Sequence, residues 1–209
     1  MNILIVGATR GIGRQLLDQA LMSGHTVTAL VRNPQRLAIE HERLRVVKGD
    51  ILDSDSVARA MVGQGAVCCT IGVKAPWPRV TVFSEGTRNV LQAMKQAGVK
   101  RLICVTGIGA GDSRGHGGFL YDCIFTPLLL KPVYADKDRQ ESLIKASDVD
   151  WTIVRPGFLT NGPLTKNYRM LTDMTGVTAG WISRADVAHF ILKELESNQY
   201  LRQTPLLTS

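Results

Sequence analysis

The sequence lacks long hydrophobic runs, and nothing at its start has the form of a leader. The longest apolar run, Cys123 to Leu130, is short and is interrupted by Pro127, so no membrane-spanning helix is predicted. The first predicted strand begins at Asn2, which leaves no room for a signal peptide. These absences lead us to expect a cytoplasmic protein with no membrane partner.

Cysteine is also scarce, with four residues in the chain. Cys68 and Cys69 are adjacent on a predicted buried strand, while Cys104 and Cys123 show no paired spacing. This pattern matches neither a metal site nor a disulfide framework. We therefore expect core thiols and no bound metal.

Clusters of like charge are absent, although the formal net charge is +7. Lys and Arg are dispersed with no run of five, aromatic residues do not alternate with them, and no nucleic-acid-binding module is recognisable. The composition therefore predicts no nucleic-acid partner. A positive field that attracts a polyanionic dinucleotide explains the excess charge at least as well.

What the chain does have is a regular alternation of strand and helix patterns over its 209 residues, without internal repeats. We expect one domain, 1–209, with a Rossmann-type α/β fold, in which a doubly wound parallel sheet is covered on both faces. Ligands of such sheets bind beyond the carboxyl ends of the strands. The predicted strands are Asn2 to Val6, Thr26 to Val31, Leu44 to Lys48, Ala66 to Thr70, Arg101 to Thr106, Trp151 to Arg155 and a short one around Leu206, and the predicted helices are Gly11 to Met22, Ser54 to Val62, Thr81 to Ala97, Asp136 to Ala146 and Arg184 to Glu196.

The most informative motif is a glycine-rich loop that follows the first strand and opens the first helix. Glycines at these points allow a tight turn, a close approach of the backbone to a diphosphate, and close packing of helix on sheet. The free N–H groups and the positive dipole of the helix N-terminus then face the anion. An ordinary turn is the alternative, but the strand, loop, helix and second strand together favour a dinucleotide site formed by Gly7, Thr9, Arg10, Gly11, Ile12 and Gly13.

Arg32 directly follows the second strand, at the place where an NAD-preferring fold usually carries an acidic residue. A cation at this place suits the 2′-phosphate of NADP, and Arg10 and Arg36 could converge on the same group. The alternative is that these arginines are solvated surface charges, which is the simpler interpretation of Arg36 alone. For Arg32 with Arg10 we expect NADP(H) as cofactor.

Further cofactor contacts are predicted after the third and fourth strands. Asp50 can accept a hydrogen bond from the adenine amino group while Ile51 covers the ring, or Asp50 can instead cap the following helix. Ile71 and Gly72 end the fourth strand, and the glycine lets the backbone lie close to the cofactor ribose or simply forms a turn.

Several motifs resemble the short-chain dehydrogenase/reductase superfamily, in its atypical branch that contains biliverdin reductase B, also called flavin reductase, and the NmrA-like proteins. The resemblance implies a Rossmann domain with a small substrate region formed by later loops, NADPH-dependent reduction of flavins, quinones or open-chain tetrapyrroles, and a monomer. The motifs are the loop from Gly7 to Gly13, Gly49-Asp50-Ile51, Ser84 to Val90, Val154 to Gly157, Asp148 to Thr152 and Ile182 to Ala188.

The catalytic pair of the superfamily, a Tyr with a Lys four residues later, is missing. Tyr134 is followed by Lys137, three residues on, and Thr106 is followed by Gly107 where biliverdin reductase B has a serine. A simple ketone needs a positioned proton donor, whereas a conjugated acceptor delocalises the incoming electrons and can take its proton from solvent. We therefore expect a planar acceptor, with Lys137 and Tyr134 as catalytic candidates. Lys137 on an exposed helix face is the alternative.

Other cofactor contacts expected at the strand ends are Thr106, Gly107 and Pro156, the last of which could support the carboxamide. Arg155 is either a ligand contact or a partner for Asp186.

The segment from Gly107 to Lys131 combines a glycine-rich hinge with an apolar stretch, and this predicts a lid over a planar substrate. His116 in the hinge is a conceivable acid, although a lone loop histidine is more often solvated. Possible pocket walls are Phe119, Tyr121, Phe125, Phe158 and Leu159.

Because the usual catalytic pair is missing, a second function class stays open, namely a non-catalytic sensor that binds NAD(P)H and acts through partner proteins. The chain carries no added interaction module, and we favour the reductase.

Overall fold

The computed structural model describes residues 1–73, 80–118 and 130–209. Its centre is an eight-stranded sheet with the strand order β3-β2-β1-β4-β5-β6-β10-β8, in which β8 alone runs antiparallel to its neighbour. The first six positions form the doubly wound order of dinucleotide-binding folds. The strands are β1 (Asn2–Val6), β2 (Thr26–Val31), β3 (Leu44–Lys48), β4 (Ala66–Cys69), β5 (Arg101–Val105), β6 (Asp150–Pro156), β8 (Arg169–Leu171) and β10 (Leu206–Thr208).

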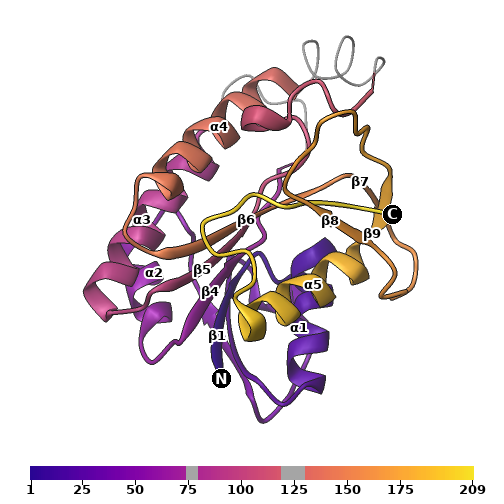
Figure 1. Cartoon of the computed structure of the whole chain (residues 1–209). Helices are drawn as coiled ribbons and strands as arrows, with labels where there is room; N and C mark the ends of the chain where they lie inside the picture. Colours follow the sequence, from indigo (N-terminus) through magenta and orange to yellow (C-terminus); the bar gives the residue numbers. More distant parts are fainter. Residues whose placement is uncertain (74–79, 119–129) are drawn as a thin grey trace.

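Helices cover both faces of the sheet (Figure 1). The helices α1 (Gly11–Met22) and α5 (Arg184–Ser197) pack together on one face. The helices α2 (Ser54–Met61), α3 (Val82–Ala97) and α4 (Lys131–Lys145) cover the other face. The expected fold class is therefore confirmed.

The strands read as continuous apolar runs because their side chains are buried on both faces. In β1, Ile3 and Ile5 join the core beneath α1 and α5, while Leu4 and Val6 join the core beneath α2, α3 and α4. The alternation of a strand thus supplies two separate cores from four consecutive residues.

Several features depart from the expected elements, among them the edge strand β8, which was not predicted. The helix α4 begins at Lys131 and not at Asp136, because Pro132 lies in its first turn, where the missing N–H costs no helical hydrogen bond. A two-stranded sheet of β7 (Phe158–Thr160) and β9 (Trp181–Ser183) was not predicted, since a strand of three residues gives no periodic signal.

The described residues bear on two expectations of the sequence, that the chain has no membrane-spanning helix and that it has no metal site. Within it, no helix combines the length and the apolar character that crossing a bilayer requires. Cys68, Cys69 and Cys104 are free and buried, whereas Cys123 lies outside the described residues. No group of metal-binding side chains occurs among residues 1–73, 80–118 and 130–209.

Candidate active site

A cleft of about 1340 Å³ lies along the carboxyl ends of the parallel strands. It receives the loops that follow β1, β2, β3, β4, β5 and β6, as expected for a doubly wound sheet. The structure thus brings nearly all of the predicted site residues to one place. Those that line the cleft are Gly7, Thr9, Arg10, Gly11, Ile12, Arg32, Arg36, Asp50, Ile51, Ile71, Gly72, Thr106, Gly107, Tyr134, Lys137 and Pro156.

The glycine loop forms a cradle at the start of α1. Gly7 and Gly11 have positive φ angles of +100° and +61°, which residues with a Cβ adopt only with strain. The residue before the helix, Arg10, makes no side-chain capping bond, so the first N–H groups of α1 are left for a ligand. Since Gly11 and Ile12 line the cleft, this uncapped N-terminus fits an anionic diphosphate.

Gly13 does not line the cleft but sets the position of α1. A Cβ on Gly13 would lie 2.3 Å from the carbonyl oxygen of Gly7 and 2.4 Å from the hydroxyl oxygen of Thr70. The hydrogen atom of glycine therefore permits the helix to pack directly against the loop.

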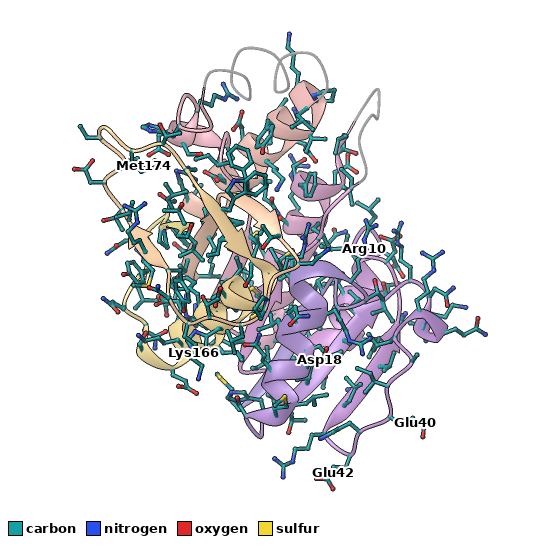
Figure 2. The ribbon with its side chains drawn as sticks, turned by 90° about the vertical axis from the view of Figure 1, so that its right-hand side faces the viewer. Arg10, Asp18, Glu40, Glu42, Lys166 and Met174 are labelled. Carbon is teal, nitrogen blue, oxygen red and sulfur yellow. The ribbon has the colours of Figure 1, made fainter. Side chains whose placement is uncertain are left out.

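One end of the cleft is strongly cationic. Arg10, Arg32 and Arg36 line it, and none of the three forms an ion pair among the described residues. Arg10 donates a hydrogen bond to the Gly72 carbonyl at 3.4 Å. Figure 2 shows Arg10 well away from Glu40 and Glu42, which lie on another loop.

Asp50 is the one carboxylate among the described residues that line the cleft. Its Oδ1 accepts a hydrogen bond from the backbone N–H of Leu52 at 3.0 Å. The alternative role of Asp50 as the helix cap is wrong, because Asp53 is the N-cap of α2 and accepts from the N–H of Asp55.

Lys137 and Tyr134 meet at the middle of the cleft, one turn apart on α4. A Cβ on Gly107 would lie 3.7 Å from the Tyr134 hydroxyl oxygen and 3.9 Å from the Lys137 Nζ. The Nζ donates to the Thr106 carbonyl and lies 5.1 Å from the centre of the Phe83 ring. Lys137 is therefore directed into the cleft, and its placement on an exposed helix face is excluded.

Burial lowers the pKa of Lys137 from its usual value of 10.5 to about 8, because the low-polarity surroundings disfavour the ammonium form. Nearby Cys104, Glu141 and Cys69 raise the pKa in part but do not restore it. At neutral pH the side chain is still mainly protonated, and it gives up its proton readily.

A buried ion-pair network lies behind Thr106. The side chain of Arg155 is fully buried, and its Nε donates to Glu141 Oε1 at 3.1 Å while its Nη1 pairs with Asp112 at 2.6 Å. Glu141 also accepts a hydrogen bond of 2.8 Å from the Thr106 hydroxyl. Both expected roles of Arg155 are wrong, since it neither lines the cleft nor pairs with Asp186.

The loop 107–118 is anchored to α4, and this corrects its interpretation as a flexible hinge. The N–H of Gly111 donates to Asp138 at 2.8 Å, and Arg114 pairs with the same carboxylate. A short 3-10 helix, η2 (Gly111–Ser113), forms within the loop. The apolar stretch predicted to be a lid, with Phe119, Tyr121 and Phe125, lies outside the described residues.

His116 does not line the cleft, so its conceivable role as the acid is not supported by its position. Its Nδ1 lies 2.8 Å from the Val177 carbonyl oxygen, and its own carbonyl accepts from the N–H of Ala179. His116 therefore ties the loop to the segment that precedes β9.

The far end of the cleft is apolar. Phe158 and Leu159, which follow β6, line it as expected. Val80, Phe83 and Val133 also line the cleft and form a separate apolar cluster, whose Phe83 ring lies beside Lys137. The predicted residues thus divide the cleft into a cationic end and an apolar end, with Lys137 and Tyr134 between them.

Asn161 and Arg184 also line the cleft and are among the lining residues that the sequence analysis missed. Arg184 occupies the first turn of α5, where the helix dipole disfavours a cation. The unfavourable placement of a cation at a helix N-terminus was the signal in the sequence that could have drawn attention to Arg184. By itself, however, it does not indicate a ligand.

Comparisons with known proteins agree with this geometry. An uncharacterized chloroplastic protein of Arabidopsis thaliana is 29% identical over 209 residues, covering 93% of this chain and 71% of that protein. An uncharacterized sugar epimerase of Bacillus subtilis (strain 168), YhfK, is 27% identical, covering 94% of this chain and 88% of that protein. The structure of ChuY from Escherichia coli O157:H7, described as an anaerobilin reductase, has a TM-score of 0.85 and 26% identity, covering 100% of this chain and 97% of that one.

These likenesses support the expected resemblance at the level of an atypical NAD(P)-binding reductase of the short-chain dehydrogenase/reductase type. A family model described as NAD(P)H-binding matches residues 7–198, which include the glycine loop, the cationic end and Lys137. The chain belongs to this NAD(P)H-binding family.

Proposed function

We propose that the protein is an NADPH-dependent reductase of planar conjugated acceptors, such as flavins, quinones or open-chain tetrapyrroles. The observation that carries the proposal is one continuous cleft that is lined by arginines after β1 and β2, by Lys137 beside Thr106 after β5, and by Phe158 after β6. The likeness to ChuY, described as an anaerobilin reductase, supports the open-chain tetrapyrrole within this class.

The preference for NADPH over NADH rests on the charges at the cationic end. Four arginines and Lys137 line the cleft among the described residues, against Asp50 as the single carboxylate. Arg32 directly follows β2, at the position where an acidic residue would bind the ribose 2′-hydroxyl of NAD. A guanidinium there binds the 2′-phosphate of NADP instead.

When bound, the nicotinamide supplies a hydride. The chain's own residues hold the acceptor and provide a proton. Phe158 and Leu159 give a planar molecule an apolar surface, and the Lys137 ammonium donates a hydrogen bond or a proton to a heteroatom of the reduced acceptor. The Thr106 hydroxyl does not carry this role, because it donates to buried Glu141.

The proposal is tested by following NADPH oxidation with purified protein against FMN, riboflavin, a quinone, a dichlorophenol dye and biliverdin, with NADH in parallel. We expect turnover with at least one of these acceptors and a higher kcat/KM with NADPH. Tight NADPH binding without turnover across the panel would contradict the reductase and support the sensor.

Replacing Lys137 with alanine is expected to lower kcat about tenfold. This loss is smaller than the usual contribution of a general acid, because a conjugated acceptor can also take its proton from solvent. In the wild type, kcat should fall as the pH rises through about 8, where the ammonium loses its proton. The Lys137→Ala variant should lose this pH dependence, and its melting temperature should change little. The measurement is a pH-rate profile of both proteins.

The control is Lys95→Ala, which removes an exposed lysine of α3 that does not line the cleft. It should keep the wild-type rate and pH profile. An unchanged rate in Lys137→Ala would remove Lys137 from the reaction.

A further inference from the structure

Arg184 lies beside the turn that opens α1, although it belongs to α5 near the other end of the chain. Its Nε would be 3.7 Å, and its Cδ 3.8 Å, from a Cβ placed on Gly11. Arg184 lines the large cleft and also a small side cavity of about 110 Å³ that Gly11 and Arg14 share. The guanidinium therefore borders the cradle that fits the diphosphate.

Hydrogen bonds from one nitrogen of the guanidinium, Nη1, fix the orientation of the Arg184 side chain. Its Nη1 donates to Asn161 Oδ1 at 2.9 Å and, more weakly, to the Leu159 carbonyl at 3.4 Å. Within the described residues, its Nε and Nη2 have no hydrogen-bond partner. These two nitrogens remain as donors next to Gly11.

The charge of Arg184 is not neutralised by a carboxylate of the described part of the chain. Asp186, two residues later, is already bound by the Ser183 hydroxyl and by the N–H groups of Thr165 and Lys166. The first turn of α5 is also an unfavourable place for a cation because of the helix dipole. An anion beside Gly11 would neutralise the charge of the Arg184 guanidinium and would offset its unfavourable interaction with the helix dipole.

Arg14 provides the contrast. It lies one turn further along α1 and borders the same side cavity, but not the cleft. Its Nε pairs with Asp18 at 3.0 Å, and its Nη1 donates to the Leu37 carbonyl. Arg14 therefore has its partners within the protein, whereas Arg184 has unused donors.

We propose that Arg184 binds the diphosphate of the dinucleotide from α5, while the N–H groups of the first turn of α1 bind it from the glycine loop. The inference deepens the proposed function, because it rests on NADPH as the ligand of the cleft. Since the same guanidinium holds Leu159 and Asn161, it connects the diphosphate to the apolar wall where the acceptor would lie.

The test compares two ligands in Arg184→Gln and in the wild type. NADPH carries the diphosphate, whereas adenosine 2′-monophosphate carries the adenine and the 2′-phosphate without it. We expect the Kd of NADPH to rise about tenfold, the size of one lost charge-assisted contact, and the Kd of adenosine 2′-monophosphate to stay the same. The salt dependence of NADPH binding should also become weaker, because one cation fewer contacts the ligand.

The matched control is Arg14→Gln, which removes the same charge from the neighbouring position and should bind both ligands like the wild type. An unchanged Kd of NADPH in Arg184→Gln would overturn the inference, as would an equal loss of affinity for both ligands. The proposed function fails separately, if the wild type binds NADPH and reduces no acceptor; the Arg184 result then still stands, because it is measured by binding alone.

Discussion

Replacing Arg32 with aspartate is expected to reverse the cofactor preference of the protein from NADPH to NADH. Arg32 is exposed, directly follows β2 and lines the cleft, so the new carboxylate would occupy the position that binds the ribose 2′-hydroxyl of NAD. The substitution removes a charge-assisted contact to the 2′-phosphate and adds a repulsion against it. Two effects of about tenfold each predict that the ratio of the two Kd values changes about hundredfold.

The measurement is the Kd of NADPH and of NADH for both proteins at one low ionic strength, because salt screens charges at an exposed site. Arg202→Asp is the matched control, since it makes the same change in net charge at an exposed residue that does not line the cleft. Arg202 has a φ of +56°, a conformation that aspartate tolerates better than most residues. A ratio that stays the same in Arg32→Asp would show that Arg32 does not contact the 2′-phosphate.

The parts of the site that the sequence could predict are those set by a single element and its strand end. The glycine loop, Arg32 and Ile71 each follow a strand of clear apolar pattern, and parallel strands must end at the same edge of the sheet. Their meeting in one cleft follows from topology alone. Lys137 was predicted from its spacing to Tyr134, and it reaches the same cleft because α4 follows β5 and the Lys137 Nζ donates to the Thr106 carbonyl at the end of that strand.

The parts that could not be predicted depend on which of several partners a side chain selects. In the sequence analysis Arg155 was given either a ligand contact or a pairing with Asp186, and only the packing of α4 against β6 brings Glu141 to it. Arg184 reaches Gly11 because α1 and α5 pack on the same face, a contact between the two ends of the chain. Sequence periodicity indicates which face of a helix or strand is buried, but it does not indicate which other element packs against that face.

The correction at the loop 107–118 shows the same limit. Glycine-rich composition predicts flexibility, yet Asp138 and Arg155 hold this loop through the N–H of Gly111 and through Asp112. A Cβ on Gly111 would lie 2.6 Å from Arg155 Nη2, so here the glycine serves close packing. Composition alone does not distinguish a glycine that makes the backbone flexible from a glycine that permits close packing.

Replacing Gly13 with alanine is expected to impair both folding and cofactor binding. The new Cβ would lie 2.3 Å from the Gly7 carbonyl oxygen and 2.4 Å from the Thr70 hydroxyl oxygen, and the first of these atoms is backbone and cannot turn away. Overpacking of this kind costs about 3 kcal/mol, while alanine in place of glycine within a helix returns about 1 kcal/mol. We expect a net loss of about 2 kcal/mol in the free energy of unfolding.

Relief of the contact requires α1 to move away from the loop, and this movement displaces the N–H groups that face the diphosphate. NADPH affinity should therefore fall more than about hundredfold, since several charge-assisted contacts depend on the position of one helix end. Denaturant unfolding and NADPH titration measure the two effects separately. Gly65→Ala is the control, because its Cβ would lie at ordinary contact distances, 3.4 Å from the Asn2 carbonyl oxygen and 3.9 Å from the Met1 Cε, and it should bind NADPH like the wild type. A Gly13→Ala protein that unfolds more easily but keeps its NADPH affinity would show that the position of α1 does not set cofactor binding, which would then depend on the arginines of the cleft.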